Sequence, residues 1–194
     1  MTFRLGLTGS IGMGKSTTAE MFAREGCAVW DADATVHRLY GPGGAAVAPL
    51  ASAFPAAVVD GAVDRAALRA AINADPAALG RIEAIVHPLV QADRADFARQ
   101  TSADIAVFDI PLLFETGAEA EMDAVACVRV SRETQADRVL ARGTMTRDQF
   151  EVILAKQMPI DDKVARAEYV IDTTTLESAA RDVHSVLNDI RSRL

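Results

Sequence analysis

The chain has 194 residues, of which 50% are hydrophobic, 24% are charged and only 5% are aromatic. These values are typical of a globular domain and argue against a disordered or fibrous protein. The 20 basic and 27 acidic residues give a net charge of -7, which argues against a nucleic-acid partner, because phosphate backbones are bound by basic surfaces. An anionic small molecule remains compatible with this charge, since a local pocket can be positive on an acidic protein.

The two cysteines, Cys27 and Cys127, lie in apolar runs far apart, without the spacing of a metal site. We interpret both as buried thiols in a reducing compartment. No signal peptide is visible, and no segment approaches the roughly 20 apolar residues that span a bilayer. We therefore expect a cytoplasmic protein without a membrane partner. The oligomeric state stays open.

Short apolar runs alternate with longer helical patterns from one end of the chain to the other. The first predicted helix covers about residues 15–25 and is followed by Gly26, a residue that favours a left-handed stop. The last predicted helix begins where Thr174 and Glu177 have the spacing of a capping box. Repetition of strand, helix and strand predicts an α/β fold with a five-stranded parallel sheet. The predicted strands are residues 3–8, 27–30, 105–109, 124–130 and 169–171.

Two segments interrupt this alternation. The segment of about residues 41–100 contains several helical patterns and no convincing strand. One of these helical patterns ends at His87-Pro88. We predict a helical insertion there, and a second helical insertion at about 131–165. In the second one Ser131 can cap a helix, and Thr146 and Gln149 have the spacing of a capping box. We expect a single domain, with a core of about residues 1–40, 101–130 and 166–194.

Residues 9–16, Gly-Ser-Ile-Gly-Met-Gly-Lys-Ser, form a complete G-x-x-x-x-G-K-[ST] phosphate-binding loop between a strand and a helix. Its glycines let backbone N–H groups converge on an anion, and the helix N-terminus adds partial positive charge. Lys15 can reach the outer phosphates, and the Ser16 hydroxyl can coordinate Mg²⁺. We therefore predict ATP as co-substrate together with Mg²⁺. The candidate nucleotide-binding residues are Gly9, Gly12, Met13, Gly14, Lys15, Ser16 and Thr17.

A phosphate-binding loop occurs in kinases, in mechanical ATPases and in GTP-dependent switches. The base-reading motif N-K-x-D of GTP-dependent switches is absent from the sequence. The chain is also small for a molecular motor, and it has the size of a small-molecule kinase. These observations favour a kinase with a P-loop kinase-type three-layer fold.

Acidic residues follow two of the predicted strands. Asp31 and Asp33 come directly after the second strand, where one carboxylate can hold a Mg²⁺-bound water and the other can orient an acceptor hydroxyl. Either of them could instead cap the following helix. Asp109 ends the third predicted strand and is a second candidate for the metal-side carboxylate. Glu115, at the end of the following apolar loop, is a candidate substrate ligand.

Basic residues in the two insertions can contact phosphates. Arg138 and Arg142 are four residues apart and therefore share one helix face, from which they could close over transferring phosphates. A solvated basic face is the alternative. In the first insertion His87 is a candidate substrate residue, and Arg69 is one of several arginines that could bind an anion.

In combination, these segments resemble the dephospho-CoA kinase family over nearly the whole chain. The phosphate-binding loop alone is shared by many families, but the ordered set of segments is much more specific. That set comprises residues 7–17, Asp31-Ala32-Asp33, residues 64–69, His87-Pro88-Leu89, Pro111-Leu112-Leu113-Phe114-Glu115, residues 133–135, Arg138, Arg142, residues 155–159 and residues 167–172. The resemblance implies ATP-dependent phosphorylation of the ribose 3′-hydroxyl of dephospho-CoA, giving CoA and ADP. It also implies a nucleotide-binding core, a helical substrate-binding insertion and a helical lid that carries arginines.

The resemblance further implies roles for single residues. Asp33 would be the base near the acceptor hydroxyl. Lys15 and Arg142 would stabilise the transferring phosphoryl group, and Arg138 would assist from the lid. His87 would lie near the substrate phosphates.

Two positions depart from the family. Many relatives carry an acidic residue after the lid arginine, where this chain has Gly143. Some relatives have an apolar residue at the position of Asp109. The metal role of Asp109 therefore rests on its place at a strand end, and Asp31 is the alternative.

Two other functions remain in competition with this hypothesis. The first is another small-molecule kinase of the same fold, which acts on a nucleoside monophosphate or a shikimate-like acceptor. The second is a nucleotide-gated switch protein that binds ATP to control a partner. The Asp31/Asp33 pair and the paired arginines disfavour the switch, because a switch requires neither.

Overall fold

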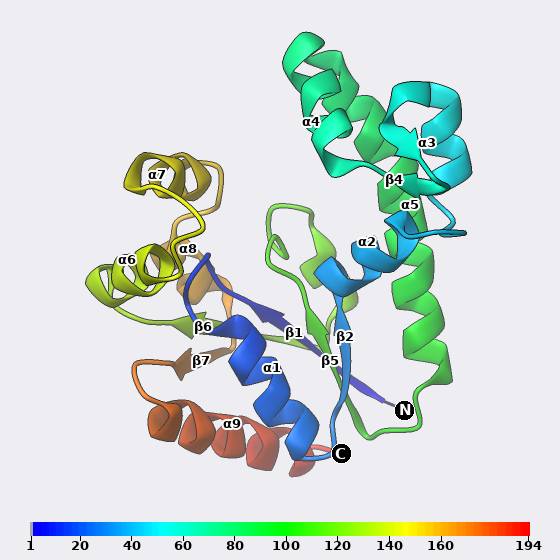
Figure 1. Ribbon diagram of the computed structural model, residues 1–194. Coiled ribbons are helices and arrows are strands. Elements are labelled where there is room, and N and C mark those ends of the chain that lie inside the picture. Colours follow the sequence, from blue (N-terminus) through cyan, green and yellow to red (C-terminus); the bar gives the residue numbers. More distant parts are fainter. Residues whose placement is uncertain (1) are drawn as a thin grey trace. The chain divides into compact units, whose positions relative to one another are not determined.

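The computed structural model describes residues 2–194, and a five-stranded sheet forms its centre. The strand order is β2-β5-β1-β6-β7, and the pairs β1–β5, β1–β6 and β6–β7 are parallel (Figure 1). The predicted α/β fold is confirmed, and each predicted strand boundary lies within one residue of the observed one. The strands are β1 (Phe3–Thr8), β2 (Ala28–Asp31), β5 (Ile105–Asp109), β6 (Ala124–Arg129) and β7 (Tyr169–Asp172).

The chain forms two compact units. The first extends to Trp30 and resumes at Thr101, and the second comprises Asp31–Gln100. Within residues 2–194, no helix is both long enough and apolar enough to cross a membrane. Both cysteines, Cys27 and Cys127, are buried free thiols, as predicted.

In the first unit, helices cover both faces of the sheet. Helices α1 and α9 pack against each other along one face, where Leu5, Leu7 and Val183 belong to a single apolar core (Figure 1). Side chains alternate between faces along a strand, so Cys127 points to the opposite face from Ala126 and Val128. Cys127 is nevertheless fully buried, so that second face is covered as well, and α8 contacts β6. The helices of this unit are α1 (Lys15–Arg24), α6 (Arg132–Ala141), α7 (Arg147–Ala155), α8 (Ile160–Arg166) and α9 (Leu176–Arg191), with a 3₁₀ turn at Ala118–Glu121.

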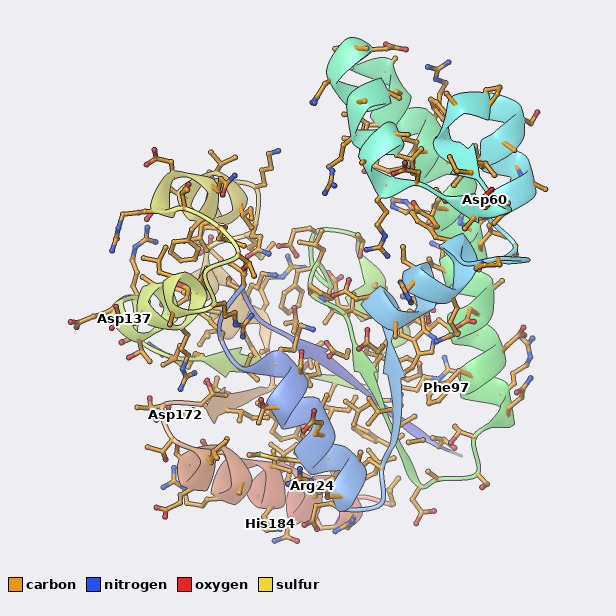
Figure 2. The ribbon with its side chains drawn as sticks, viewed as in Figure 1. Arg24, Asp60, Phe97, Asp137, Asp172 and His184 are labelled. Carbon is orange, nitrogen blue, oxygen red and sulfur yellow. The ribbon has the colours of Figure 1, made fainter. Side chains whose placement is uncertain are left out.

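In the first unit, the predicted helix ends agree with the structure in three cases and differ in one. Gly26 has a φ of 88° after α1, the Ser131 hydroxyl accepts from the Thr134 N–H, and α7 begins with the predicted capping box. The capping box of α9 was assigned to the wrong residues, because it uses Thr175 and Ser178. The Thr174 hydroxyl donates instead to Asp172, which lies at the end of β7 (Figure 2).

The second unit is mainly helical and has its own apolar core, which includes Leu50, Phe54, Leu68, Ile82 and Val86. Its elements are α2 (Ala32–Tyr40), α3 (Val47–Ala53), a 3₁₀ turn at Pro55–Ala57, β3 (Val58–Val59), β4 (Ala62–Val63), α4 (Arg65–Ala74) and α5 (Ala77–Gln100).

Two predictions for this unit were wrong. The unit contains a short antiparallel hairpin, β3–β4, whose turn residues Asp60 and Gly61 both have positive φ (Figure 2). No helix ends at His87-Pro88, because α5 continues through Pro88 to Gln100. A proline removes the hydrogen bond to the carbonyl four residues earlier. That residue, Ala84, is exposed, so water can satisfy its carbonyl.

Candidate functional site

The phosphate-binding loop joins β1 to α1, and its glycines are required by close contacts. A Cβ atom on Gly9 would lie 2.3 Å from Val128 Cγ2, and one on Gly12 would lie 2.4 Å from Val139 Cγ2. Gly12 and Gly14 also have φ values of 78° and 83°, which other residues rarely adopt. Gly14 stands at the N-cap of α1, and the helix begins at Lys15. The loop therefore opens directly onto a helix N-terminus.

Lys15 and Asp109 form an ion pair at the ends of two neighbouring strands. The parallel register pairs Asp109 with Leu7, and the Lys15 ammonium donates to Asp109 Oδ1. The Asp109 side chain is only 2% exposed and that of Lys15 is 14% exposed. Because an isolated buried charge is costly, each group compensates the other. Two residues predicted for the site are thus brought together.

A cavity of about 500 Å³ adjoins the loop. It is lined by Gly12, Gly14 and Thr17 of the loop and α1, and by both predicted arginines, Arg138 and Arg142, of α6 and its C-terminal end. Residues 173–176 complete the wall. The cavity can therefore hold an anionic ligand between the loop and the two guanidinium groups.

The two arginines differ in how they are held. The Arg138 guanidinium donates to Thr173 O at 2.7 Å and to Thr174 O at 3.1 Å, which orients it over the cavity wall. Arg142 is exposed at the C-terminal end of α6. Arg138 is thus pre-positioned, whereas Arg142 keeps its rotamer freedom.

Glu115 is paired with a lysine that the sequence analysis did not single out. Lys163 in α8 is fully buried, and its ammonium donates to Pro111 O at 2.9 Å and contacts Glu115 Oε1 at 2.9 Å. The Glu115 carboxylate also accepts from the Met158 N–H at 2.9 Å. Partial burial acts to raise the pKa of Glu115, but the hydrogen bonds from Lys163 and Met158 outweigh it and lower this pKa below its ordinary value. Glu115 therefore ties the loop after β5 to α8.

In the second unit, Asp31 is the N-cap of α2. Its Oδ1 accepts from the Ala34 N–H at 2.9 Å. Asp31 therefore has the capping role, which is the alternative to the metal role predicted from the sequence. Asp33 is exposed in the first turn of α2. The helix is held on α5, because Thr35 and Arg38 both donate to Asp93. Arg69 on α4 and His87 on α5 are exposed.

The sequence resembles that of known proteins over nearly its whole length. The family model described as dephospho-CoA kinase matches residues 3–178. A Ruegeria pomeroyi protein named dephospho-CoA kinase is 66% identical over 192 residues, which are 99% of this chain and 98% of the relative. The chain belongs to the dephospho-CoA kinase family.

Solved structures agree with this family assignment at the level of the fold. A Thermus thermophilus crystal structure aligns with a TM-score of 0.85 and 33% identity, covering 100% of this chain and 98% of the other. A structure described as dephospho-CoA kinase from Campylobacter jejuni has a TM-score of 0.72 and 21% identity, with 100% of both chains covered. The dephospho-CoA kinase fold therefore spans the chain, including the residues after 178.

In this member of the dephospho-CoA kinase family, the predicted site residues divide between the two units. Lys15, Asp109, Arg138 and Arg142 belong to the first unit, with Glu115 and the loop glycines. Asp31, Asp33, Arg69 and His87 belong to the second. Among residues 2–194, no three His, Cys, Asp or Glu side chains gather as a ready-made metal cluster.

Proposed function

We propose that the protein phosphorylates the ribose 3′-hydroxyl of dephospho-CoA with ATP, giving CoA and ADP. The observation that carries this proposal is the 66% identity, over nearly the whole chain, to a relative named dephospho-CoA kinase. The phosphate-binding loop with its Lys15–Asp109 pair and the arginine-lined cavity support it independently, because phosphoryl transfer depends mainly on positioning and charge.

In this proposal the first unit binds ATP. The loop N–H groups and the N-terminus of α1 hold the phosphates, and Lys15 leaves Asp109 to contact the outer phosphate oxygens. Arg138 and Arg142 stabilise the charge of the transferring phosphoryl group. Residues 131–165, which carry both arginines, act as a lid that excludes water during the transfer.

Asp33 is the proposed base at the acceptor hydroxyl. It follows Trp30, the last residue before the second unit, by three residues. Since each residue spans at most about 3.6 Å, its Cα lies within roughly 11 Å of the Trp30 Cα, at the carboxyl end of β2. Asp33 is exposed and makes no cap, so its carboxylate is available to orient the hydroxyl and take its proton.

Mg²⁺ is proposed to accompany ATP, with Ser16 and Asp109 as the protein ligands. One hydroxyl and one carboxylate fit this ion, because Mg²⁺ in kinases takes most of its ligands from phosphates and water. When bound, it would neutralise charge on the phosphate oxygens. Asp109 is preferred to Asp31, because the Asp31 carboxylate caps α2.

The second unit, in this proposal, binds dephospho-CoA through residues of about 41–100. Arg69 and His87 are exposed there and can contact the acceptor's phosphates. We also propose Glu115 as a substrate residue at the edge of the first unit and a cytoplasmic location for the enzyme. The net charge of -7 makes a nucleic-acid partner unfavourable.

A coupled assay of ADP release tests this function against its competitors. The panel contains dephospho-CoA, nucleoside monophosphates and shikimate as acceptors. We expect stimulation by dephospho-CoA alone. Stimulation by another acceptor but not by dephospho-CoA would contradict the proposal, and slow acceptor-independent turnover would favour the switch.

A further inference from the structure

The tip of the phosphate-binding loop, Ile11, is held by two glutamines from distant parts of the chain. The Gln135 amide donates from Nε2 to Ile11 O at 2.7 Å. The Gln157 carbonyl Oε1 accepts from the Ile11 N–H at 3.2 Å. Gln135 lies in α6 and is 2% exposed, and Gln157 is half-buried just after α7. Backbone and amide chemistry force these orientations, since an N–H can only donate and a C=O can only accept.

The Ile11 side chain is held by the same segment. It packs against Ala136, Val139 and Phe150, which form a small apolar cluster of their own. Thus the N–H, the C=O and the side chain of one loop residue are all engaged by residues 131–165. Close approach of α6 to the loop also explains Gly12, because a Cβ there would overlap Val139.

These contacts determine where the neighbouring amides of the loop point. In a trans peptide the C=O and the following N–H point in opposite directions. Gln135 therefore turns the Gly12 N–H away from α6 by holding Ile11 O. The Thr173 hydroxyl donates to Met13 O at 2.7 Å and by the same rule turns the Gly14 N–H away from Thr173. Gly12 and Gly14 both line the cavity of about 500 Å³.

Gln157 acts on the preceding peptide in a complementary way. Because it holds the Ile11 N–H, the Ser10 C=O points to the other side of that peptide, where it accepts from the Met13 N–H at 3.2 Å. The Ile11 amide is thereby removed from the set that can bind an anion, and the loop is closed by its own Ser10–Met13 bond. The two glutamines thus fix successive peptide planes.

We infer that Gln135 and Gln157 are positioning residues for ATP: they hold Ile11 from both sides and thereby orient the loop amides that receive the phosphates. This inference rests on the proposed function, in which the loop binds ATP. It also means that residues 131–165 influence phosphate binding through the orientation of the loop, in addition to the proposed contacts of Arg138 and Arg142 with the phosphates.

Two glutamate variants of the full chain test the inference, since they add the same charge beside the same loop residue. Gln157→Glu keeps an acceptor for the Ile11 N–H, whereas Gln135→Glu replaces the donor to Ile11 O by an acceptor. We expect Gln135→Glu to weaken ATP binding by about tenfold or more, and Gln157→Glu to stay within about threefold of the wild type. Gln157→Met, which removes the acceptor, should behave like Gln135→Glu. Titration calorimetry with ATP and Mg²⁺ measures these affinities.

The KM for dephospho-CoA separates positioning from general damage. We expect it to stay within about twofold of the wild type in all three variants, because the loop amides act on ATP alone. Equal losses in both glutamate variants would indicate an effect of charge and overturn the inference. Wild-type ATP affinity in Gln135→Glu would overturn it as well.

Amide hydrogen exchange in the unliganded wild type provides a test that needs no variant. We expect the Ile11 amide to be protected, because it donates to Gln157. Exchange at the rate of an unstructured peptide would overturn the inference even if the variants fail to fold. A wild type that is protected at Ile11 but does not bind ATP would contradict the proposed function instead.

Discussion

Several candidate groups of the first unit are buried and paired, whereas Asp33, Arg69 and His87 of the second unit are exposed. Lys15 and Asp109 neutralise each other at the sheet edge, and Gln135 holds the loop from inside the protein. Asp33 and His87, by contrast, stand on helix surfaces. The difference teaches that the phosphate-binding loop and Arg138, both proposed for ATP, are positioned before any ligand arrives, which is the most effective way to stabilise developing charge. Asp33 and His87, which are proposed for the acceptor, are placed only by the helices that carry them.

The largest effect on turnover should come from replacing Lys15 in the first unit. Lys15→Ala removes the charge proposed for the outer phosphates and leaves the Asp109 carboxylate buried without its ammonium partner. We expect turnover to fall on the order of 10³-fold even with saturating acceptor. Steady-state ADP release measures this.

Arg24→Ala is the matched control for Lys15→Ala. Arg24 is a cation on the same helix, α1, but its side chain is 78% exposed and pairs with the exposed Glu20 (Figure 2). We expect its turnover to remain near that of the wild type. A similar loss in both variants would contradict the role of Lys15.

The buried Lys163 should matter for the stability of the first unit. Lys163→Met fills the space but leaves Glu115 without its cation and Pro111 O without its donor. We expect the free energy of unfolding to fall by about 3–5 kcal/mol. Urea unfolding followed by circular dichroism measures this, with Lys156→Met, at an exposed lysine, expected within about 0.5 kcal/mol of the wild type. Equal stability of both variants would show that the Lys163 pair contributes nothing.

Asp33→Asn tests the exposed candidate base of the second unit. The amide keeps the shape of the side chain but cannot take a proton, so we expect turnover to fall by about 10²-fold or more while ATP affinity is unchanged. Asp31→Asn should stay near wild-type turnover, because asparagine also caps helices. A larger loss of turnover in Asp31→Asn than in Asp33→Asn would indicate that Asp31 is the base or the metal ligand.

The smallest effect concerns pH. Since the pKa of Glu115 is lowered in the folded protein, its stabilising contribution is complete above the unfolded value of about 4.5 and is lost as pH falls through the folded value. We therefore expect the free energy of unfolding to decline below about pH 4.5 by more in the wild type than in Glu115→Gln. Urea unfolding at a series of pH values measures the two slopes, and parallel slopes would contradict this account.

The sheet and the phosphate-binding loop could be predicted because their signals are local. Continuous apolar runs define strands that are covered on both faces, and the loop motif includes its own structural context. The β3–β4 hairpin was missed because each strand has two residues, although the Asp60-Gly61 pair between apolar residues was an available signal.

The roles of Lys163, Gln135 and Gln157 could not be derived in the same way. Lys163 lies in a helix with the polar composition of a surface, and its burial depends on Glu115, 48 residues earlier in the chain. The glutamines contact Ile11 across 124 and 146 residues. Such long-range pairs leave no periodic pattern in the sequence, so only the tertiary structure identifies them.

The most direct test of the proposed function is the position of the new phosphate. The protein is incubated with ATP and dephospho-CoA, and the product is examined by mass spectrometry and phosphorus NMR, with 2′-deoxy and 3′-deoxy analogues of the acceptor in parallel. Our account predicts a single added phosphate on dephospho-CoA and on the 2′-deoxy analogue, and none on the 3′-deoxy analogue. A phosphorylated 3′-deoxy analogue, or ATP hydrolysis without any phosphorylated acceptor, would contradict it.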